Sequence, residues 1–156
     1  MHRFLIRASR PLDSRGSAIF LAPLLLLMMV YLTGFFVDLG DGFSKADGLD
    51  QALSLSAAAA STQVSAGKFY RDGLVVLDPV SSQESALSRL ITSMPKGTVL
   101  ENPPSVAVSG GAVCVRATEL IKMPFALIPG VSRYLRYSSS SSAIAKGSDT
   151  SVAPGC

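Results

Sequence analysis

The sequence predicts an α+β chain, with one long N-terminal transmembrane helix followed by a small extracytoplasmic domain. The domain is expected to hold a short antiparallel sheet and one further helix. Three features predict this: an apolar run over residues 18–37, an amphipathic pattern over 81–94, and a hairpin pattern around Gly110 and Gly111. Only the residues after about Asp38 are free to fold in water, so the chain has room for one small domain. This length argues against a large catalytic core.

Residues 18–37 contain no ionisable side chain except the phenol of Tyr31. A helix of this length, at about 1.5 Å per residue, covers the roughly 30 Å hydrocarbon core of a bilayer. A signal-peptide core is usually about 7 to 15 residues long and is closely followed by a cleavage site with small residues. Here the run is longer and the first alanine-rich candidate, residues 57–60, lies far downstream. The pattern favours a retained span, with a cleaved signal peptide as the alternative.

The charges that flank this run predict its orientation. The basic tail, residues 1–17, has four arginines and one aspartate, whereas the far flank opens with Asp38 and Asp41. The excess of positive charge predicts a cytoplasmic N-terminus and an extracytoplasmic C-terminal domain on a single-pass protein of the cytoplasmic membrane. Beyond the tail, basic and acidic residues are equal in number. The basic pI therefore reflects topology and does not indicate a nucleic-acid-binding surface.

A helical spacing continues past the span, which predicts an extracytoplasmic continuation of the helix over residues 38–67. Gly40, Gly42 and Gly48 favour a bend near the membrane surface, since each glycine costs about 1 kcal/mol in a helix. Small side chains at residues 57–60 would let another backbone approach closely, either in a second subunit or in the protein's own sheet. The apolar and small residues that recur at intervals of three or four, and that we expect to pack, are Leu39, Phe43, Ala46, Leu49, Leu53, Ala57, Ala60 and Val64.

Residues 68–146 form the predicted α+β domain, which begins with a short strand over 73–80 and an amphipathic helix over 81–94. Ser81 or Ser82 is the expected N-cap of this helix. The residues expected on its apolar side are Ala86, Leu87, Leu90, Ile91 and Met94.

In the second half of the domain, the sequence pattern predicts strands. Apolar and polar residues alternate on both sides of Gly110 and Gly111, which indicates a hairpin with a tight turn. After a proline-bounded connection at 123–131, the serine-rich residues 132–145 form either a third antiparallel strand or a flexible stretch. Residues 147–156 are expected to be a loose C-terminal tail unless Cys156 ties it down.

The two cysteines, Cys114 and Cys156, both lie on the predicted extracytoplasmic side, where disulfides persist. A bridge that closes a loop of this length would contribute roughly 3 to 4 kcal/mol. The alternative is two free thiols, with Cys114 buried in a strand as a small hydrophobic residue.

The sequence offers no catalytic, cofactor or metal site, and we expect no enzymatic activity. The sole histidine, His2, lies in the cytoplasmic tail, across the predicted membrane from both cysteines. A Ser/His/Asp, Cys/His or zinc arrangement therefore cannot form within one chain. The aspartates of residues 38–50 lack the ligand spacing of a calcium-binding EF-hand loop.

Three stretches carry a family resemblance: "RGSA" before the apolar run, "VDLGDGFSKADGLDQALSLSAAAAS" after it, and the hairpin "VAVSGGAVCVRAT". With the overall layout, they resemble the TadE/TadG-like proteins of tight-adherence (Flp-type) pilus assembly systems, in the divergent actinobacterial form. The resemblance implies a pilin-like helix that anchors the chain in the bilayer and packs with other pilin-like or Tad apparatus subunits, in the membrane or in a cell-surface filament.

The resemblance also implies processing by a prepilin-type peptidase after a glycine, with a glutamate at the fifth mature position. Gly16 and Ser17 fit the cleavage point, but the fifth residue is Leu21. Cleavage and an intact start to the helix therefore both stay open. A different class of function also stays open, in which the chain is a membrane-tethered or secreted extracellular binding module whose helix is only an anchor.

Overall fold

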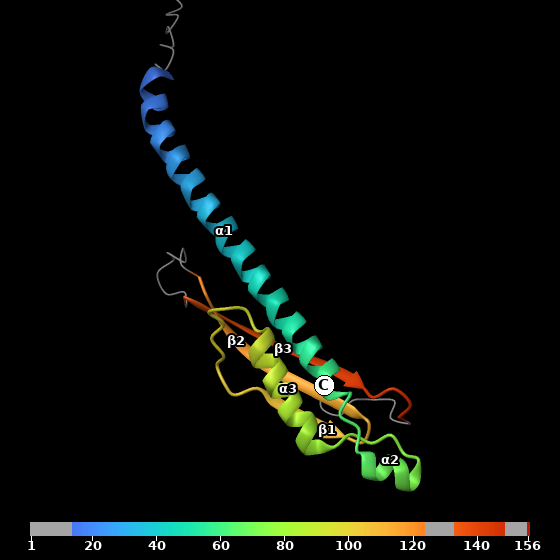
Figure 1. Cartoon of the computed structure of the whole chain (residues 1–156). Coiled ribbons are helices and arrows are strands. Elements are labelled where there is room, and N and C mark those ends of the chain that lie inside the picture. Colours follow the sequence, from blue (N-terminus) through green and yellow to red (C-terminus); the bar gives the residue numbers. More distant parts are fainter. Residues whose placement is uncertain (1–13, 124–132, 149–155) are drawn as a thin grey trace, which may run out of the picture. The chain divides into compact units, whose positions relative to one another are not determined.

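The computed structural model describes residues 14–123, 133–148 and 156. It confirms an α+β chain with one long apolar N-terminal helix and a small three-stranded antiparallel sheet (Figure 1). The chain divides into two compact units, Met1–Val37 and Asp38–Cys156. Its elements are α1 (Ser14–Ala60), α2 (Ala66–Asp72), α3 (Pro79–Ser93), β1 (Ser105–Ser109), β2 (Ala112–Lys122) and β3 (Tyr134–Ile144).

The sheet has the strand order β1-β2-β3, and both pairings are antiparallel. Gly110 and Gly111 connect β1 to β2 as predicted, and Gly110 has a φ of 59°, which glycine adopts at little cost. β3 pairs with β2 without interruption from Ala112↔Ile144 to Lys122↔Tyr134. The serine-rich stretch is therefore a third strand and not a flexible segment. Residues 124–132 and 149–155, in the predicted connection and tail, lie outside the described residues.

The core of the second unit lies between one face of the sheet and the helices α1 and α3. Leu49 and Leu53 of α1 are completely buried, as are Val113 and Val115 of β2. The helix places every third or fourth residue on one side, and the strand places every second residue on one face, so both patterns meet in the same core. Burial of each large aliphatic side chain contributes roughly 1.5 to 3 kcal/mol.

The helix α1 ends at Ala60, which is earlier than the continuation to residue 67 that the sequence predicted. The hydroxyls of Ser61 and Thr62 donate to the carbonyl oxygens of Ala58 and Ala59, at 2.8 Å and 2.7 Å. These local bonds compete with further helical turns. The predicted bend has no counterpart as a break in the helix, because α1 is continuous through its glycines.

The helix α3 begins at Pro79 with Asp78 as its N-cap, so the prediction of Ser81 or Ser82 as the cap was wrong. Proline is favoured in the first helical turn, where its missing N–H needs no partner. The Ser81 hydroxyl instead donates to the Asp78 carboxylate, and this bond lowers the pKa of Asp78. The Ser82 hydroxyl is buried and donates to the carbonyl of Ala60 at 3.2 Å, which joins α3 to the end of α1.

Two further expectations for this region differ from the structure. Residues 73–80 form no regular strand among the described residues, and only an isolated bridge joins Leu77 to Val64. Ala86 and Leu90 are buried on α3 as predicted, but Ile91 is 67% exposed. The buried side of α3 is therefore narrower than the predicted apolar side, and it includes Ser82.

Candidate membrane-spanning and interaction surfaces

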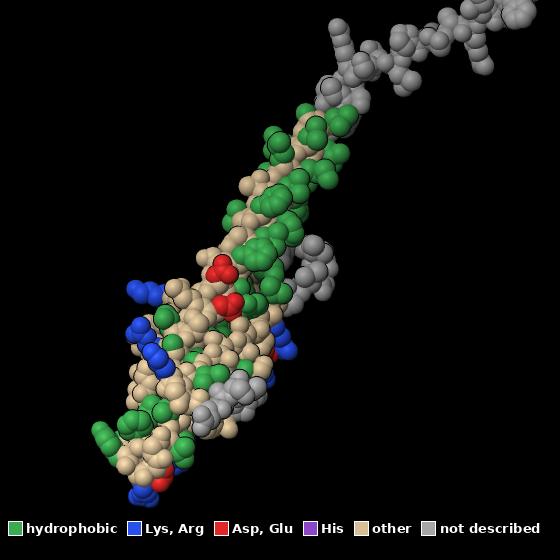
Figure 2. Space-filling view, turned by 90° about the vertical axis from the view of Figure 1, so that its right-hand side faces the viewer, with side chains coloured by type: hydrophobic (Ala, Val, Ile, Leu, Met, Phe, Trp, Pro, Cys, Tyr) green, Lys and Arg blue, Asp and Glu red, His purple; other side chains and the backbone are tan. Residues whose placement is uncertain are grey.

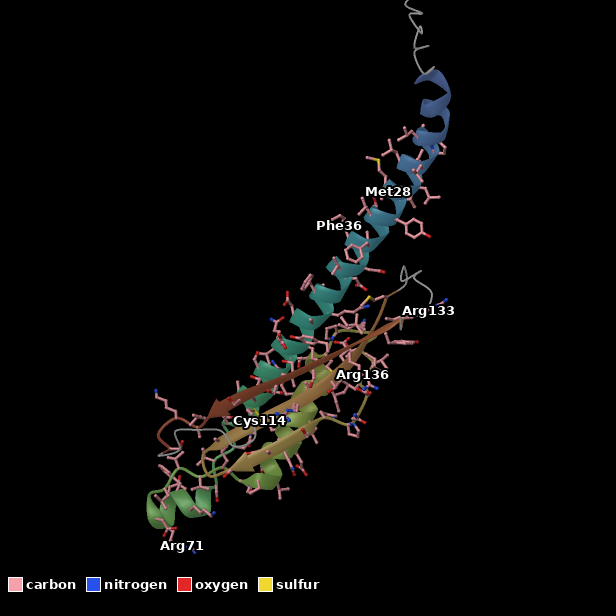
Figure 3. The ribbon with its side chains drawn as sticks, turned by 180° about the vertical axis from the view of Figure 1, so that it is seen from behind. Met28, Phe36, Arg71, Cys114, Arg133 and Arg136 are labelled. Atoms are coloured by element: carbon pink, nitrogen blue, oxygen red, sulfur yellow. A yellow bond between two sulfur atoms is a disulfide. The ribbon has the colours of Figure 1, made fainter. Side chains whose placement is uncertain are left out.

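Residues 21–37, which we call the first part of α1, carry large apolar side chains that are exposed around the helix, and Figure 2 shows one face of this surface. Met28 and Phe36 project away from the ribbon in Figure 3 and are 59% and 65% exposed. The Thr33 hydroxyl in this part donates to the Met29 carbonyl at 2.8 Å and so is satisfied within the helix. In water such a surface would be unfavourable, whereas in hydrocarbon it is expected. Among the described residues, the chain has one helix long and apolar enough to cross a membrane.

The candidate processing point lies at the beginning of this helix. Gly16 and Ser17 both fall within the first turn of α1, which starts at Ser14. The bond between them is therefore in helical backbone. Cleavage at this bond stays a prediction.

The predicted packing residues divide into two groups. Leu49, Leu53, Ala57 and Ala60 are completely buried and belong to the chain's own core. Of the alanine-rich residues 57–60, Ala57 and Ala60 therefore pack within the chain, whereas Ala58 is exposed.

The other four predicted packing residues have different surroundings. Leu39 and Phe43 are exposed, at 39% and 67%, and Ala46 is half-buried. Val64 lies beyond the end of α1 and pairs with Leu77 in a β-bridge, so its assignment to the helix face was wrong. The sequence spacing was correct for the core, but it did not identify where the helix ends.

A disulfide joins Cys114 to Cys156, with Cα atoms 5.8 Å apart. This finding excludes the alternative of two free thiols. Cys114 is in β2, between Ala107 of β1 and Ser142 of β3, on the sheet face opposite the core (Figure 3). The Sγ atom of Cys156 lies 3.5 Å from the carbonyl oxygen of Ser141. The last residue of the chain is thus fixed against the outer face of the sheet.

A group of polar residues joins α1 to the sheet on the core side. The Tyr137 hydroxyl donates to Asp50 Oδ2 at 2.9 Å, and this bond is the main cause that raises the pKa of Tyr137. Glu119 lies opposite Tyr137 in the register and is only 2% exposed. Burial raises the pKa of Glu119, against the opposing effect of the Lys45 charge. Lys45 also forms an ion pair with Asp41, with an N–O distance of 2.7 Å.

Sequence reasoning did not single out Glu119, although a signal was present. The residues of β2 whose side chains face the core are Val113, Val115, Ala117, Glu119 and Ile121. One carboxylate therefore lies among otherwise apolar side chains. Within the described ranges, no group of three or more His, Cys, Asp or Glu residues could hold a metal ion. The geometry of this polar group is suited to holding α1 against the sheet.

The helix α2 forms a second exposed surface. It has no buried residue, and its aromatic side chains Phe69 and Tyr70 are 47% and 85% exposed. Their rings pack edge to face, with centroids 5.6 Å apart. Arg71 of the same helix lies at the end of the second unit in Figure 3. We call Phe69, Tyr70 and Arg71 the α2 surface.

Comparisons with known proteins give no family assignment. The chain matches no protein-family model, and it matches no curated protein and no solved structure. The likeness to TadE/TadG-like proteins therefore stays a prediction from the sequence, and the function has to be argued from the chain itself.

Proposed function

We propose that this chain is a non-enzymatic structural or assembly subunit, of a minor pilin-like kind, in a Tad/Flp-type pilus or a related secretion apparatus. The observation that carries the proposal is the helix α1, which runs without interruption for 47 residues. Its first part is exposed and apolar, and its last part supplies Leu49 and Leu53 to the core of the second unit. One helix thus supplies both the exposed apolar segment and part of the core, which suits a subunit whose anchor and domain share one element.

In this proposal the chain is a single-pass protein of the cytoplasmic membrane, with its N-terminus in the cytoplasm and its domain outside. The Cys114–Cys156 disulfide supports the outer location, because disulfides persist in oxidising compartments. Side chains of the span, together with Leu39 and Phe43, supply apolar surface for packing against other pilin-like or Tad apparatus subunits. A prepilin-type peptidase is a further partner if Gly16–Ser17 is cleaved.

The test replaces residues 21–37 with an equally long alternating leucine and alanine span. Membrane fractionation measures anchoring, and the amount of filament sheared from the cells measures assembly. We expect normal anchoring with loss of filaments, because a specific packing surface is lost while apolarity is retained. A span with the original residues in scrambled order is the matched control for composition and should fail in the same way. Normal filaments with the leucine-alanine span would contradict the proposal.

Intact mass then distinguishes a filament subunit from a membrane-resident assembly component. A chain that begins at Ser17 and occurs in the sheared fraction identifies a processed, filament-associated subunit. A full-length chain that is confined to membranes identifies an assembly component. A chain that starts beyond residue 50 would contradict both, because the span would have been removed as a signal peptide.

The α2 surface favours a second candidate function, an extracellular binding module whose helix only anchors it. Exposed aromatic side chains beside a cation are common at binding surfaces, and Tyr70 contributes nothing to the core at 85% exposure. The discriminating variant is Phe69→Ala with Tyr70→Ala. Under the structural proposal filaments form normally, whereas a binding module loses attachment of cells to surfaces while its anchoring is unchanged.

A further inference from the structure

The strand β3 is the last strand of the sheet, and its outer edge faces away from β2 (Figure 3). The backbone bonds at its two ends show which residues point outward. Met123 N–H donates to the Arg133 carbonyl at 2.8 Å, and Ala145 N–H donates to the Gly111 carbonyl at 2.7 Å. Odd-numbered residues therefore bond toward β2. Because bonding directions alternate along an antiparallel strand, even-numbered residues of β3 direct their N–H and C=O groups away from β2.

These outward groups belong to a long edge of the sheet. Within the described part of the chain, no backbone hydrogen bond reaches the outward groups of Arg136, Ser138, Ser140 or Ser142. Proteins usually protect such edges with proline, a bulge or charged residues. The stretch from Tyr137 to Ile144 has no proline and no charge, and its pairing with β2 has no bulge. This edge can therefore accept a further strand.

The opposite edge of the sheet differs. The helix α3 packs beside β1, and the Gln83 side chain donates to the Val106 carbonyl at 3.3 Å. This bond occupies an acceptor on the outer side of β1. Of the two edges, β3 is the longer, with 11 residues against 5.

The side chains beside the β3 edge define the chemistry of the strand that fits. On the core side, Tyr137 and Ala143 are partly buried against the core, so apolar residues of an added strand would extend it. On the outer face lie the three serines and Arg136, whose side chain is 74% exposed although it pairs with Glu101. Cross-strand neighbours of opposite charge, and pairs of hydroxyl residues, stabilise such pairings.

We propose that the outer edge of β3 binds an extended segment of another protein, by addition of a strand to the sheet. The segment alternates apolar residues with hydroxyl residues, and it has an acidic residue opposite Arg136. Backbone hydrogen bonds supply the affinity, while Arg136 and the core-side apolar positions select the sequence. This inference goes beyond the proposed function and does not depend on a pilus.

A second copy of this chain is a poorer occupant. The β3 strand of a second copy has no acidic residue to place opposite Arg136. The expected donor is therefore a different chain.

The test uses the full chain in detergent micelles and a fluorescein-labelled peptide of about seven residues. The peptide alternates threonine and valine and ends in glutamate, with the glutamate at either end to allow both strand directions. The control peptide has lysine in place of glutamate. Fluorescence anisotropy measures the affinity. We expect the glutamate peptide to bind in one direction, and the lysine peptide to bind at least about tenfold more weakly.

The decisive variant is Ser140→Pro, because it removes an outward N–H without breaking a bond to β2. Ser140→Ala is the matched control. The expected result is about a tenfold loss of affinity in Ser140→Pro and less than about a threefold change in Ser140→Ala. Circular dichroism and the intact Cys114–Cys156 disulfide establish that both variants fold.

Three results would overturn the proposal. The first is no peptide binding by the folded wild-type chain. The second is equal binding by folded Ser140→Pro, or by the lysine peptide, since the β3 edge and Arg136 would then not be used. The third is a dimer of the free chain, seen by analytical ultracentrifugation, that Ser140→Pro dissociates, since the edge would then belong to a second copy.

Discussion

Removal of the disulfide by Cys156→Ser should strongly destabilise the second unit. The bridge joins residues 42 positions apart, so its closed loop contains most of β2 and all of β3. For a loop of this length, the loss of unfolded-state entropy corresponds to about 4 kcal/mol at 25 °C. The unit Asp38–Cys156 has an unfolding entropy of about 250 cal/mol/K by the usual value per residue. Together these values predict a fall in Tm of about 15 °C.

The assay is thermal unfolding of the full chain in detergent micelles, followed by circular dichroism. Wild-type protein in reductant is the control and should unfold at the temperature of Cys156→Ser, because both lack the bridge. Addition of reductant to the variant should have no further effect. A fall of less than about 3 °C would refute the reasoning, since it would mean that the bridge constrains little of the unfolded chain.

Three further predictions follow from the same unit. Gly48→Ala should destabilise it, because the new Cβ would lie 2.7 Å from Pro95 Cγ, whereas Gly40→Ala meets nothing within 4 Å and should gain up to about 1 kcal/mol of helix propensity. Leu53→Ala should lower the free energy of unfolding by about 2 to 5 kcal/mol, because this side chain is completely buried. Glu119→Gln should stabilise the unit at neutral pH. Burial raises the pKa of Glu119 in the folded chain above its pKa in the unfolded chain. The unit is therefore most stable at pH values below the unfolded pKa, and it loses stability as the pH rises through the folded pKa. Thermal unfolding measures the stability of the two glycine variants and of Leu53→Ala. Its repetition between pH 4 and pH 8 tests whether the fall in stability with rising pH is lost in Glu119→Gln.

The sequence predicted the elements whose cause is local. The hairpin needs only two glycines between alternating strands, and Gly110 takes the positive φ that such a turn requires. Leu49 and Leu53 were found because helical spacing identifies a buried side before its partner is known. The disulfide was one of two alternatives, because cysteine spacing alone does not show which residues meet in space.

The sequence did not predict features that depend on competition between neighbouring interactions. Helix α1 ends where the hydroxyls of Ser61 and Thr62 bond back to the preceding turn, although the apolar spacing continues. Pro79 displaced the expected serine cap of α3, because its fixed φ favours the first helical position. Glu119 is buried beside Tyr137 because strand alternation places it there, at a cost that the rest of the unit offsets.

The two parts of α1 satisfy opposite requirements with one secondary structure. Around Met28 and Phe36 apolar side chains surround the helix, which is stable in hydrocarbon but would favour association in water. Around Leu49 and Leu53 the buried apolar residues occupy the side that faces the core, while Asp50 remains exposed and bonds Tyr137. We therefore expect a substitution in the first part to change the proposed anchoring and association, and one in the second part to change folding. This separation is why replacement of residues 21–37 can test assembly without unfolding the domain.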